Sequence, residues 1–301
     1  MGSEGKESGK HNGLSDVLIG FMESGIGRSA LALSSRVKDK ILQSDLGKTT
    51  KGFLENVYET YLLRDVMQRP RPEHIAIILD GNRRYALEKG IDIVKGHELG
   101  GEKLKDAAKW CYDLGIKVVT LYVFSTENFK RDKKEVGYLM TLFEKYFKKA
   151  GDSEEVHKYK IRIEAIGQLG LLPPGVRKSI RYAEEKTKDY KGHLLNVAIA
   201  YGGREEIVEA IRRIALEAKN NSLDVESIDE HLVSEHLYTK GAPDPDLVLR
   251  TSGEERISNF LIWQLAYSEL YFEDVYWPDL SKADFLGAIK AYQKRKRRFG
   301  L

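Results

Sequence analysis

The chain has 301 residues, of which 42% are hydrophobic and 32% are charged, and its formal net charge is +3. This composition fits a soluble globular protein of one large or two small domains, and the small positive excess does not predict a nucleic-acid binder. The single cysteine, Cys111, excludes an internal disulfide and favours a reducing compartment. No run of about 18 apolar residues and no secretory signal is visible, so we expect a cytoplasmic protein.

Residues 1–70 differ in pattern from the rest, and we expect them to form an N-terminal extension. Residues 1–13 are rich in Gly, Ser, Lys and Glu, which predicts disorder. Further on, five residues keep one helical face apolar over two turns: Leu54, Val57, Tyr58, Tyr61 and Leu62. Such a helix could pack on the domain or a partner subunit, or contact a membrane surface, and both interpretations remain open. The prolines at 70 and 72 end the helix and mark the entry to the main domain, residues 71–301.

From residue 73 onward, short apolar segments alternate with helical patterns. We expect strands at 75–80, 118–125, 161–167, 194–202, 247–251 and 270–277. The helices are expected near 97–114, 134–149, 174–189, 204–219, 228–237 and 282–297. Continuously apolar strands separated by helices predict an α/β fold, with a mostly parallel six-stranded sheet covered by helices on both faces.

Polar residues gather directly after four of these strands. The segments are Asp80-Gly81-Asn82-Arg83-Arg84, Ser125 to Arg131, Tyr201 to Arg204, and Arg250 to Arg256. Because parallel strands end at one edge of a sheet, and open α/β folds bind ligands there, we expect these segments to form one site.

The residue types of this expected site suit a metal ion and a diphosphate. Guanidinium groups match phosphate oxygens, and the Gly81-Asn82 turn that opens a helix offers backbone N–H groups to an anion. The carboxylate of Asp80, surrounded by positive charge, could hold Mg²⁺, which bridges carboxylate and phosphate oxygens. The arginines concerned are Arg83, Arg84, Arg250 and Arg256.

Simpler interpretations remain open for several of these residues. Asp-Gly after a strand is also an ordinary turn, Asn82 could cap the helix, and Gly202-Gly203 suits a tight strand-to-helix turn. Glu269 lies among Leu, Tyr and Phe and therefore needs a partner or a metal. The sequence contains neither a P-loop nor a dinucleotide-binding glycine motif, and no zinc-spaced His or Cys set.

From about residue 72 to its end, the chain resembles the cis-prenyltransferases, which include undecaprenyl and dehydrodolichyl diphosphate synthases. The matching segments are HIAIILDGNRRYA, TLYVFSTENFKR, NVAIAYGGREEI, DLVLRTSGEERISNFLIWQLAYSELYF and the terminal RRFG. DGNRRYA and ENFKR are closer to the eukaryotic and archaeal branch than to bacterial members. The resemblance implies a homodimeric, Mg²⁺-dependent enzyme with a hydrophobic product tunnel. Such an enzyme condenses isopentenyl diphosphate onto an allylic diphosphate and makes a cis-polyprenyl lipid carrier at a membrane.

The resemblance also implies roles for single residues. Asp80 would hold the metal and the allylic diphosphate, surrounded by Gly81, Asn82, Arg83, Arg84 and His97. The isopentenyl diphosphate would be held by Arg250, Arg256 and Ser258. Glu269 would help with the metal or orient the site across the dimer. A mobile loop would position the reacting chains through Ser125, Glu127, Asn128, Phe129 and Arg131.

Two further roles follow from the same resemblance. Asn128 with Ser125, or the departing diphosphate, would accept the proton. Arg298 and Gly300 of the terminal R-x-G would reach into the partner subunit's site.

The sequence departs from the family pattern at three positions. Ile93 stands where members often have an arginine that contacts the allylic diphosphate, Glu255 replaces a bacterial histidine, and Gln168 replaces a bacterial aspartate. The first of these departures keeps open a different donor length or an acceptor other than isopentenyl diphosphate. A non-catalytic partner subunit is a further alternative, but such subunits lose the catalytic aspartate and arginines, which this chain has. The segment 134–160 is slightly longer than in bacterial members, which favours a long product.

Overall fold

The computed structural model describes residues 45–295, and side chains from residue 55 onward. The expected disorder at residues 1–13, the side chain of Leu54, and the family residues Arg298 and Gly300 lie outside this part. The described residues form two compact units, one containing residues 71–280 with Arg295 and the other containing residues up to 70 with 281–294. The division into an extension and a catalytic domain at residue 70 stays a prediction.

The larger unit is built on a six-stranded sheet in which every neighbouring pair of strands is parallel. Its strand order is β3-β4-β2-β1-β5-β6. The strands are β1 (His74–Ile78), β2 (Val118–Ser125), β3 (Ile161–Ile166), β4 (His193–Tyr201), β5 (Leu247–Arg250) and β6 (Glu269–Phe272). The α/β prediction is therefore confirmed.

Two strands are shorter than the apolar runs that predicted them. The first run was expected to pair as far as Asp80, yet β1 ends at Ile78. The backbone turns there, because the N–H of Asp80 donates to the carbonyl of Ile78 at 3.0 Å and to Thr251 Oγ1 at 3.0 Å. The last run, expected over 270–277, pairs only as β6. The turn at the end of β1 therefore takes Asp80 out of the ladder and onto the rim of the sheet.

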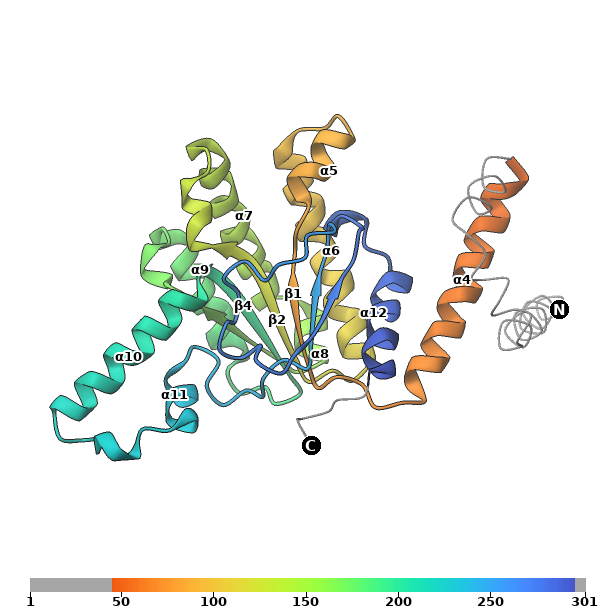
Figure 1. Cartoon of the computed structure of the whole chain (residues 1–301). Helices are drawn as coiled ribbons and strands as arrows, with labels where there is room; N and C mark the ends of the chain where they lie inside the picture. The colour runs from red at the N-terminus through yellow and green to blue at the C-terminus, as the bar shows by residue number, and fades with distance from the viewer. Residues whose placement is uncertain (1–44, 296–301) are drawn as a thin grey trace, which may run out of the picture. The chain divides into compact units, whose positions relative to one another are not determined.

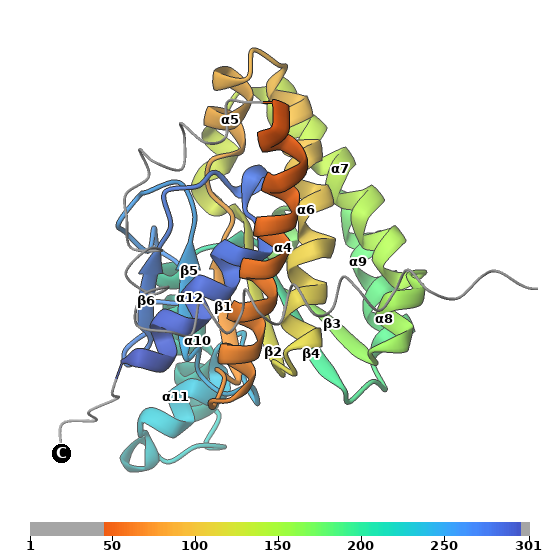
Figure 2. The same cartoon turned by 90° about the vertical axis from the view of Figure 1, so that its right-hand side faces the viewer.

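Helices cover the sheet on both faces (Figures 1 and 2). The connections β1 to β2 to β3 run in one direction across the sheet and β4 to β5 runs in the other, so right-handed crossovers place α6 and α7 on one face and α10 on the other. The first group comprises α5 (Asn82–Glu88), α6 (Ile93–Asp113), η1 (Thr126–Lys130), α7 (Lys133–Gly151) and α8 (Glu154–Lys158). The later elements are η2 (Leu169–Leu171), α9 (Pro174–Thr187), α10 (Gly203–Lys219), η3 (Val225–Ser227), α11 (Glu230–His236) and η4 (Trp277–Asp279).

The centre of the sheet is apolar, with one polar exception at the amino ends of its strands. All five residues of β1 are buried, as its uninterrupted apolar run predicts. The first of them, His74, places Nδ1 2.7 Å from the carbonyl of Pro243 and Nε2 2.8 Å from Thr120 Oγ1. Burial lowers the pKa of His74 to about 4, so its ring is neutral near pH 7.

The outer edge of β3 is closed by side chains of α9. The N–H of Ile163 donates to Thr187 Oγ1 at 3.1 Å, and the N–H of Ala165 donates to Glu184 Oε1 at 3.0 Å. These donors face away from β4, the only strand among residues 45–295 that pairs with β3. A free strand edge can pair with a strand of another chain, and here side chains of α9 bind two of the edge N–H groups instead.

The smaller unit pairs α4 (Asp45–Met67) with α12 (Lys282–Lys294). Lys290 Nζ lies 2.6 Å from Asp65 Oδ2, and Gln293 Nε2 donates to the carbonyl of Val66 at 2.9 Å. Val57 and Leu62 are buried, as the apolar face of this segment predicts. Within residues 45–295, no helix is both long enough and apolar enough to cross a bilayer.

Candidate active site

The turn after β1 is shaped for glycine and brings Asp80 to the rim. Gly81 has φ 106°, and a Cβ on it would lie 2.8 Å from Tyr276 Cδ1 and 3.0 Å from Ser252 Cβ. Gly81 is also the N-cap of α5, without a side-chain hydrogen bond, so Asn82 does not cap this helix as the simpler interpretation suggested. Instead, Asn82 Nδ2 donates to the carbonyl of Leu79 at 3.4 Å, and its buried Oδ1 has no partner among the described residues.

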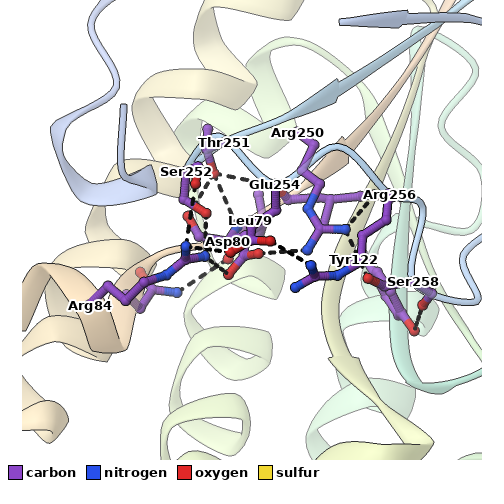
Figure 3. Close-up of polar contacts among 12 residues, drawn as sticks. Leu79, Asp80, Arg84, Tyr122, Arg250, Thr251, Ser252, Glu254, Arg256 and Ser258 are labelled. Atoms are coloured by element: carbon purple, nitrogen blue, oxygen red, sulfur yellow. Dashed lines mark hydrogen bonds and ion pairs between the residues drawn. The ribbon is translucent and has the colours of Figure 1, made fainter. Parts of the chain in front are cut away.

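The carboxylate of Asp80 lies between two guanidinium groups (Figure 3). Arg250 Nη2 donates to Oδ2 at 2.7 Å, and Arg84 Nη2 lies 3.2 Å from Oδ1. Burial by itself would raise the pKa of Asp80, but the hydrogen bond and charge of Arg250, with the charge of Arg84, hold that pKa below its ordinary value. Asp80 is therefore an ionised carboxylate at neutral pH, as a metal ligand must be.

Arg250, the last residue of β5, is the central cation of the site. Only 3% of its surface is exposed. Besides binding Asp80, its Nη1 donates to Ser258 Oγ at 2.8 Å and to the carbonyl of Arg256. Arg250 thus links the end of β1 to the loop after β5, in addition to any contact with a phosphate.

Glu254 joins two other arginines of the site, as Figure 3 shows. Its Oε1 lies 2.7 Å from Arg84 Nη1, and its Oε2 lies 2.5 Å from Arg256 Nη1. Arg84 also donates from Nη2 to Ser252 Oγ at 2.5 Å. The sequence predicts no role for Glu254, because its contact with Arg84 joins segments 170 residues apart in the chain.

A second group of cations surrounds Glu135 near the start of α7. The carboxylate lies 3.2 Å from His97 Nε2, 3.2 Å from Arg131 Nη1 and 3.7 Å from Arg83 Nε. Burial lowers the pKa of His97, and the neighbouring Glu135 opposes that shift. Glu135 was also missed, because Arg131 lies in extended backbone before α7 and the other two cations come from α5 and α6. Arg83, His97 and Arg131 are therefore brought together around one carboxylate, and their roles toward a substrate stay predictions.

The loop after β2 is held by a reciprocal hydrogen-bond pair. The N–H of Asn128 donates to Ser125 Oγ at 3.2 Å, and the N–H of Ser125 donates to Asn128 Oδ1 at 3.1 Å. This arrangement is a capping box that opens η1. Phe129 packs edge-on against Phe124, with ring centroids 4.9 Å apart, and lines a smaller cavity of about 470 Å³ beside α7.

The rim opens into a main cavity of about 1150 Å³. At its charged end lie Asp80, Arg83, Arg84, His97, Arg131, Arg250, Arg256 and Ser258, together with Ser125, Glu127 and Asn128. Beyond them the walls come from α6, α7 and the sheet and are mainly apolar: Leu104, Ala108, Leu121, Leu139, Leu142, Phe143, Phe147, Ile163, Leu195 and Val197. A charged mouth with an apolar interior suits an amphiphile that has an anionic head and a hydrocarbon tail.

Two predicted site residues with described side chains do not line this cavity: Phe129, which lines the smaller one, and Glu269. Glu269 is the first residue of β6, paired with Leu247 at the amino end of β5, and its Oε2 lies 2.7 Å from Arg295 Nη1. The site lies at the other end of β5, next to Arg250. Within one chain, therefore, Glu269 does not join Asp80, and its role across a dimer stays a prediction. Ile93, which stands where family members often have an arginine, is the first residue of α6.

Comparisons with known proteins agree with this site. Residues 78–300 match the prenyltransferase family described as undecaprenyl diphosphate synthase. A relative in Methanocaldococcus jannaschii, named tritrans,polycis-undecaprenyl-diphosphate synthase (geranylgeranyl-diphosphate specific), is 53% identical over 255 residues, which cover 82% of this chain and 91% of the relative. A relative of the same name in Picrophilus torridus is 49% identical and covers 85% of this chain and 99% of its own length.

A solved structure supports the same grouping. The crystal structure of lavandulyl diphosphate synthase from Lavandula x intermedia, in complex with dimethylallyl diphosphate, matches with a TM-score of 0.73 and 39% identity. The match covers 77% of this chain and 99% of that one. The sequence relatives are archaeal, in agreement with the branch that DGNRRYA and ENFKR indicated. The chain is a transferase of the cis-prenyltransferase family.

Proposed function

We propose that the enzyme condenses isopentenyl diphosphate repeatedly onto geranylgeranyl diphosphate and releases a cis-polyprenyl diphosphate. The single observation that carries this proposal is the main cavity, which joins an arginine-rich mouth around Asp80 to a long apolar interior. The specificity printed in the names of the archaeal relatives supports the choice of geranylgeranyl diphosphate as the allylic substrate.

The two diphosphates are assigned to the two sides of Asp80. The allylic diphosphate takes the side of α5, with Gly81, Asn82, Arg83 and Arg84, and with His97 and Arg131 beside them. The isopentenyl diphosphate takes the side of the loop after β5, with Arg250, Arg256 and Ser258. Carboxylates pair with several of these guanidinium groups: Asp80 with Arg84 and Arg250, Glu254 with Arg84 and Arg256, and Glu135 with Arg83 and Arg131. Phosphate oxygens would replace some of these contacts.

The residues present fit Mg²⁺ bound together with a diphosphate. Asp80 is an ionised, partly exposed carboxylate on the cavity wall. Among residues 45–295, no group of three or more His, Cys, Asp or Glu side chains is placed to hold a metal ion by itself. Mg²⁺ commonly needs only one or two protein carboxylates when phosphates and water complete its shell, so Asp80 would hold it. When bound, the ion neutralises charge that develops on the departing diphosphate.

In the reaction, the bond between the allylic C1 and its diphosphate oxygen breaks, and the double bond of isopentenyl diphosphate forms a new bond to that carbon. A proton then leaves C2 of the isopentenyl unit, which restores a double bond. Arg83, Arg84 and the backbone after Gly81 stabilise the leaving group's charge. Two proton acceptors remain candidates: the departing diphosphate, or Asn128 with Ser125, which line the cavity mouth.

Partner contacts belong to the same proposal. Val208 and Ile211, three positions apart on α10, are 45% and 57% exposed, and Tyr267 before β6 is 78% exposed. We assign these apolar side chains to contact with a second copy, where Glu269, Arg298 and Gly300 would complete the partner's site.

The product tail resists transfer to water, at about 0.8 kcal/mol per CH₂. We therefore expect transient contact with a membrane, to be tested by liposome flotation with and without residues 1–44.

One experiment tests the proposed reaction. Purified enzyme with Mg²⁺ and radiolabelled isopentenyl diphosphate is given dimethylallyl, geranyl, farnesyl or geranylgeranyl diphosphate, and product lengths are resolved. A ladder that starts most efficiently from geranylgeranyl diphosphate is expected. A second candidate function, prenyl transfer to an acceptor other than isopentenyl diphosphate, is favoured by Ile93 and by the likeness to lavandulyl diphosphate synthase in complex with dimethylallyl diphosphate. A single short product from dimethylallyl diphosphate alone, with no ladder, would establish that alternative.

A further inference from the structure

Asn259 hydrogen-bonds to two separate elements beside the proposed isopentenyl diphosphate site. From the loop after β5, its Nδ2 donates to Glu127 Oε1 of η1 at 3.2 Å and to Glu205 Oε2 of α10 at 3.1 Å. Its Oδ1 accepts from the N–H of Arg204 at 2.9 Å, and its carbonyl accepts from the N–H of Gly203 at 2.7 Å. One side chain and one carbonyl thus connect the β5 loop, η1 and the start of α10.

The backbone at this point needs such support. Ser258 and Asn259 have φ values of 50° and 61°, so two consecutive residues adopt the left-handed region. Asn tolerates this region, whereas Ser does so poorly. Ser258 is held by Arg250, which binds its hydroxyl at 2.8 Å, and by Tyr122, whose hydroxyl donates to its carbonyl at 3.2 Å. The hydrogen bonds of Asn259 fix the other end of the same short segment.

The amide of Asn259 also lies between two acidic side chains and binds both. Glu127 and Glu205 both accept from the Asn259 amide, and Glu205 accepts from Thr126 Oγ1 at 3.2 Å. The packing is close, because a Cβ on Gly202 would lie 2.8 Å from Asn259 Nδ2. An amide at position 259 supplies N–H donors to both carboxylates, whereas a carboxylate there would add a third negative charge.

We propose that Asn259 is a positioning residue that couples the placement of Ser258 to the η1 segment. It acts on the isopentenyl diphosphate through the neighbouring Ser258, and on the loop with Ser125 and Asn128 through Glu127. Occupation of the isopentenyl diphosphate site therefore favours one position of η1. This inference rests on the proposed function, because that function assigns the isopentenyl diphosphate to this side of Asp80.

The test replaces the amide donor at position 259 with a carboxylate and then supplies a new amide donor at position 205. In Asn259→Asp the donor becomes a carboxylate facing Glu127 and Glu205, and we expect the KM for isopentenyl diphosphate to rise roughly tenfold while the KM for the allylic substrate changes less than twofold. In the double variant Asn259→Asp with Glu205→Gln, the new amide donates to Asp, and at least half of the lost kcat/KM should return. Glu205→Gln alone, whose carbonyl oxygen can still accept from Asn259, is the matched control.

A second variant distinguishes the loss of the amide from misfolding as the cause of a raised KM. Asn259→Gly accepts the left-handed backbone and removes the amide, so it should show the same selective rise in KM with little change in melting temperature. Equal changes in both KM values, or no recovery in the double variant, would overturn the inference while wild-type activity leaves the proposed function standing. If the wild-type enzyme incorporates no isopentenyl diphosphate, the proposed function fails, and this inference fails with it.

Discussion

Arg84 of α5 and Arg256 of the β5 loop share the single carboxylate of Glu254, each bound to a different oxygen. The two arginines are assigned to different diphosphates, so Glu254 holds one cation of each subsite in a fixed position. Fixed orientation of charged groups is a large part of catalysis in reactions that develop charge on a leaving group.

Replacing Glu254 should therefore affect both substrates. In Glu254→Gln, we expect kcat/KM for the allylic and for the isopentenyl diphosphate to fall by roughly tenfold each, since both guanidinium groups lose a charged partner. Glu255→Gln changes the exposed neighbouring residue and is the matched control, with an expected change below twofold. Steady-state kinetics with each substrate varied in turn measures both. A loss confined to one substrate would contradict the shared role.

Removal of the charge of Asp80 should nearly abolish the reaction. We expect Asp80→Asn to lower kcat by a factor on the order of 10³, because the amide neither holds Mg²⁺ nor balances Arg250. Chelation of the metal from the wild-type enzyme with EDTA should give a comparable loss, restored by added Mg²⁺. Measuring kcat against Mg²⁺ concentration tests both statements, and full activity in EDTA would exclude the metal.

Filling the apolar interior should shorten the product. Ala108 lies on α6 and lines the main cavity, so Ala108→Phe places a ring in the path of the growing chain. We expect products shorter by at least one isoprene unit, resolved by chromatography, with the rate of the first condensation nearly unchanged. Ala108→Ser, which adds little volume, should leave the product length as in the wild type. Unaltered lengths in the Phe variant would show that the chain grows elsewhere.

The close contact of α6 with the Asp80 turn predicts intolerance of a single methyl group. A Cβ on Gly100 would overlap Asn82 Oδ1 and lie 3.1 Å from Trp277 Cδ1. Gly100→Ala should therefore lower the free energy of unfolding by about 1–3 kcal/mol and reduce activity through Asn82. Gly137→Ala on α7, where a Cβ meets nothing within 4 Å, should instead stabilise by about 0.5–1 kcal/mol. Urea unfolding compares the pair, and equal effects would refute the steric explanation.

The buried His74 predicts a loss of stability in acid. Its pKa of about 4 lies below the ordinary value of 6.5, so between these pH values the unfolded chain binds a proton that the folded protein does not. The stability contributed by neutral His74 is complete above pH 6.5 and falls with pH down to about 4. The total loss is about 3 kcal/mol, at roughly 1.36 kcal/mol per pH unit. Urea unfolding at pH 7 and pH 5 measures the slope. His74→Gln should have a flatter profile, and an identical profile would contradict this prediction.

The fold and the rim of the site follow from short-range patterns in the sequence. Apolar runs separated by helices predict the parallel sheet, and parallel strands must end at one edge. This geometry places Asp80, Arg250 and the Ser125 loop together without further information. Strand ends were less predictable, since the turn that ends β1 depends on Thr251, which lies far away in the chain.

The carboxylates that organise the arginines could not be found in the same way. Glu135 and Glu254 each contact cations from other elements, and such contacts leave no periodic signal. Asn259 is a similar case, because its role depends on two left-handed residues and on the start of α10. The ring of Phe129 packs on Phe124 and lines the second cavity, so its expected contact with the substrates stays a prediction.

The hydrogen bonds from α9 to the edge of β3 also have a consequence for partly unfolded states. If α9 detaches before the sheet opens, the N–H groups of Ile163 and Ala165 become free beside an apolar strand, the arrangement that starts intermolecular β pairing. While it stays attached, α9 prevents this intermolecular pairing during heating and refolding. Thr187 and Glu184 therefore contribute to solubility by keeping the edge of β3 covered in partly unfolded molecules.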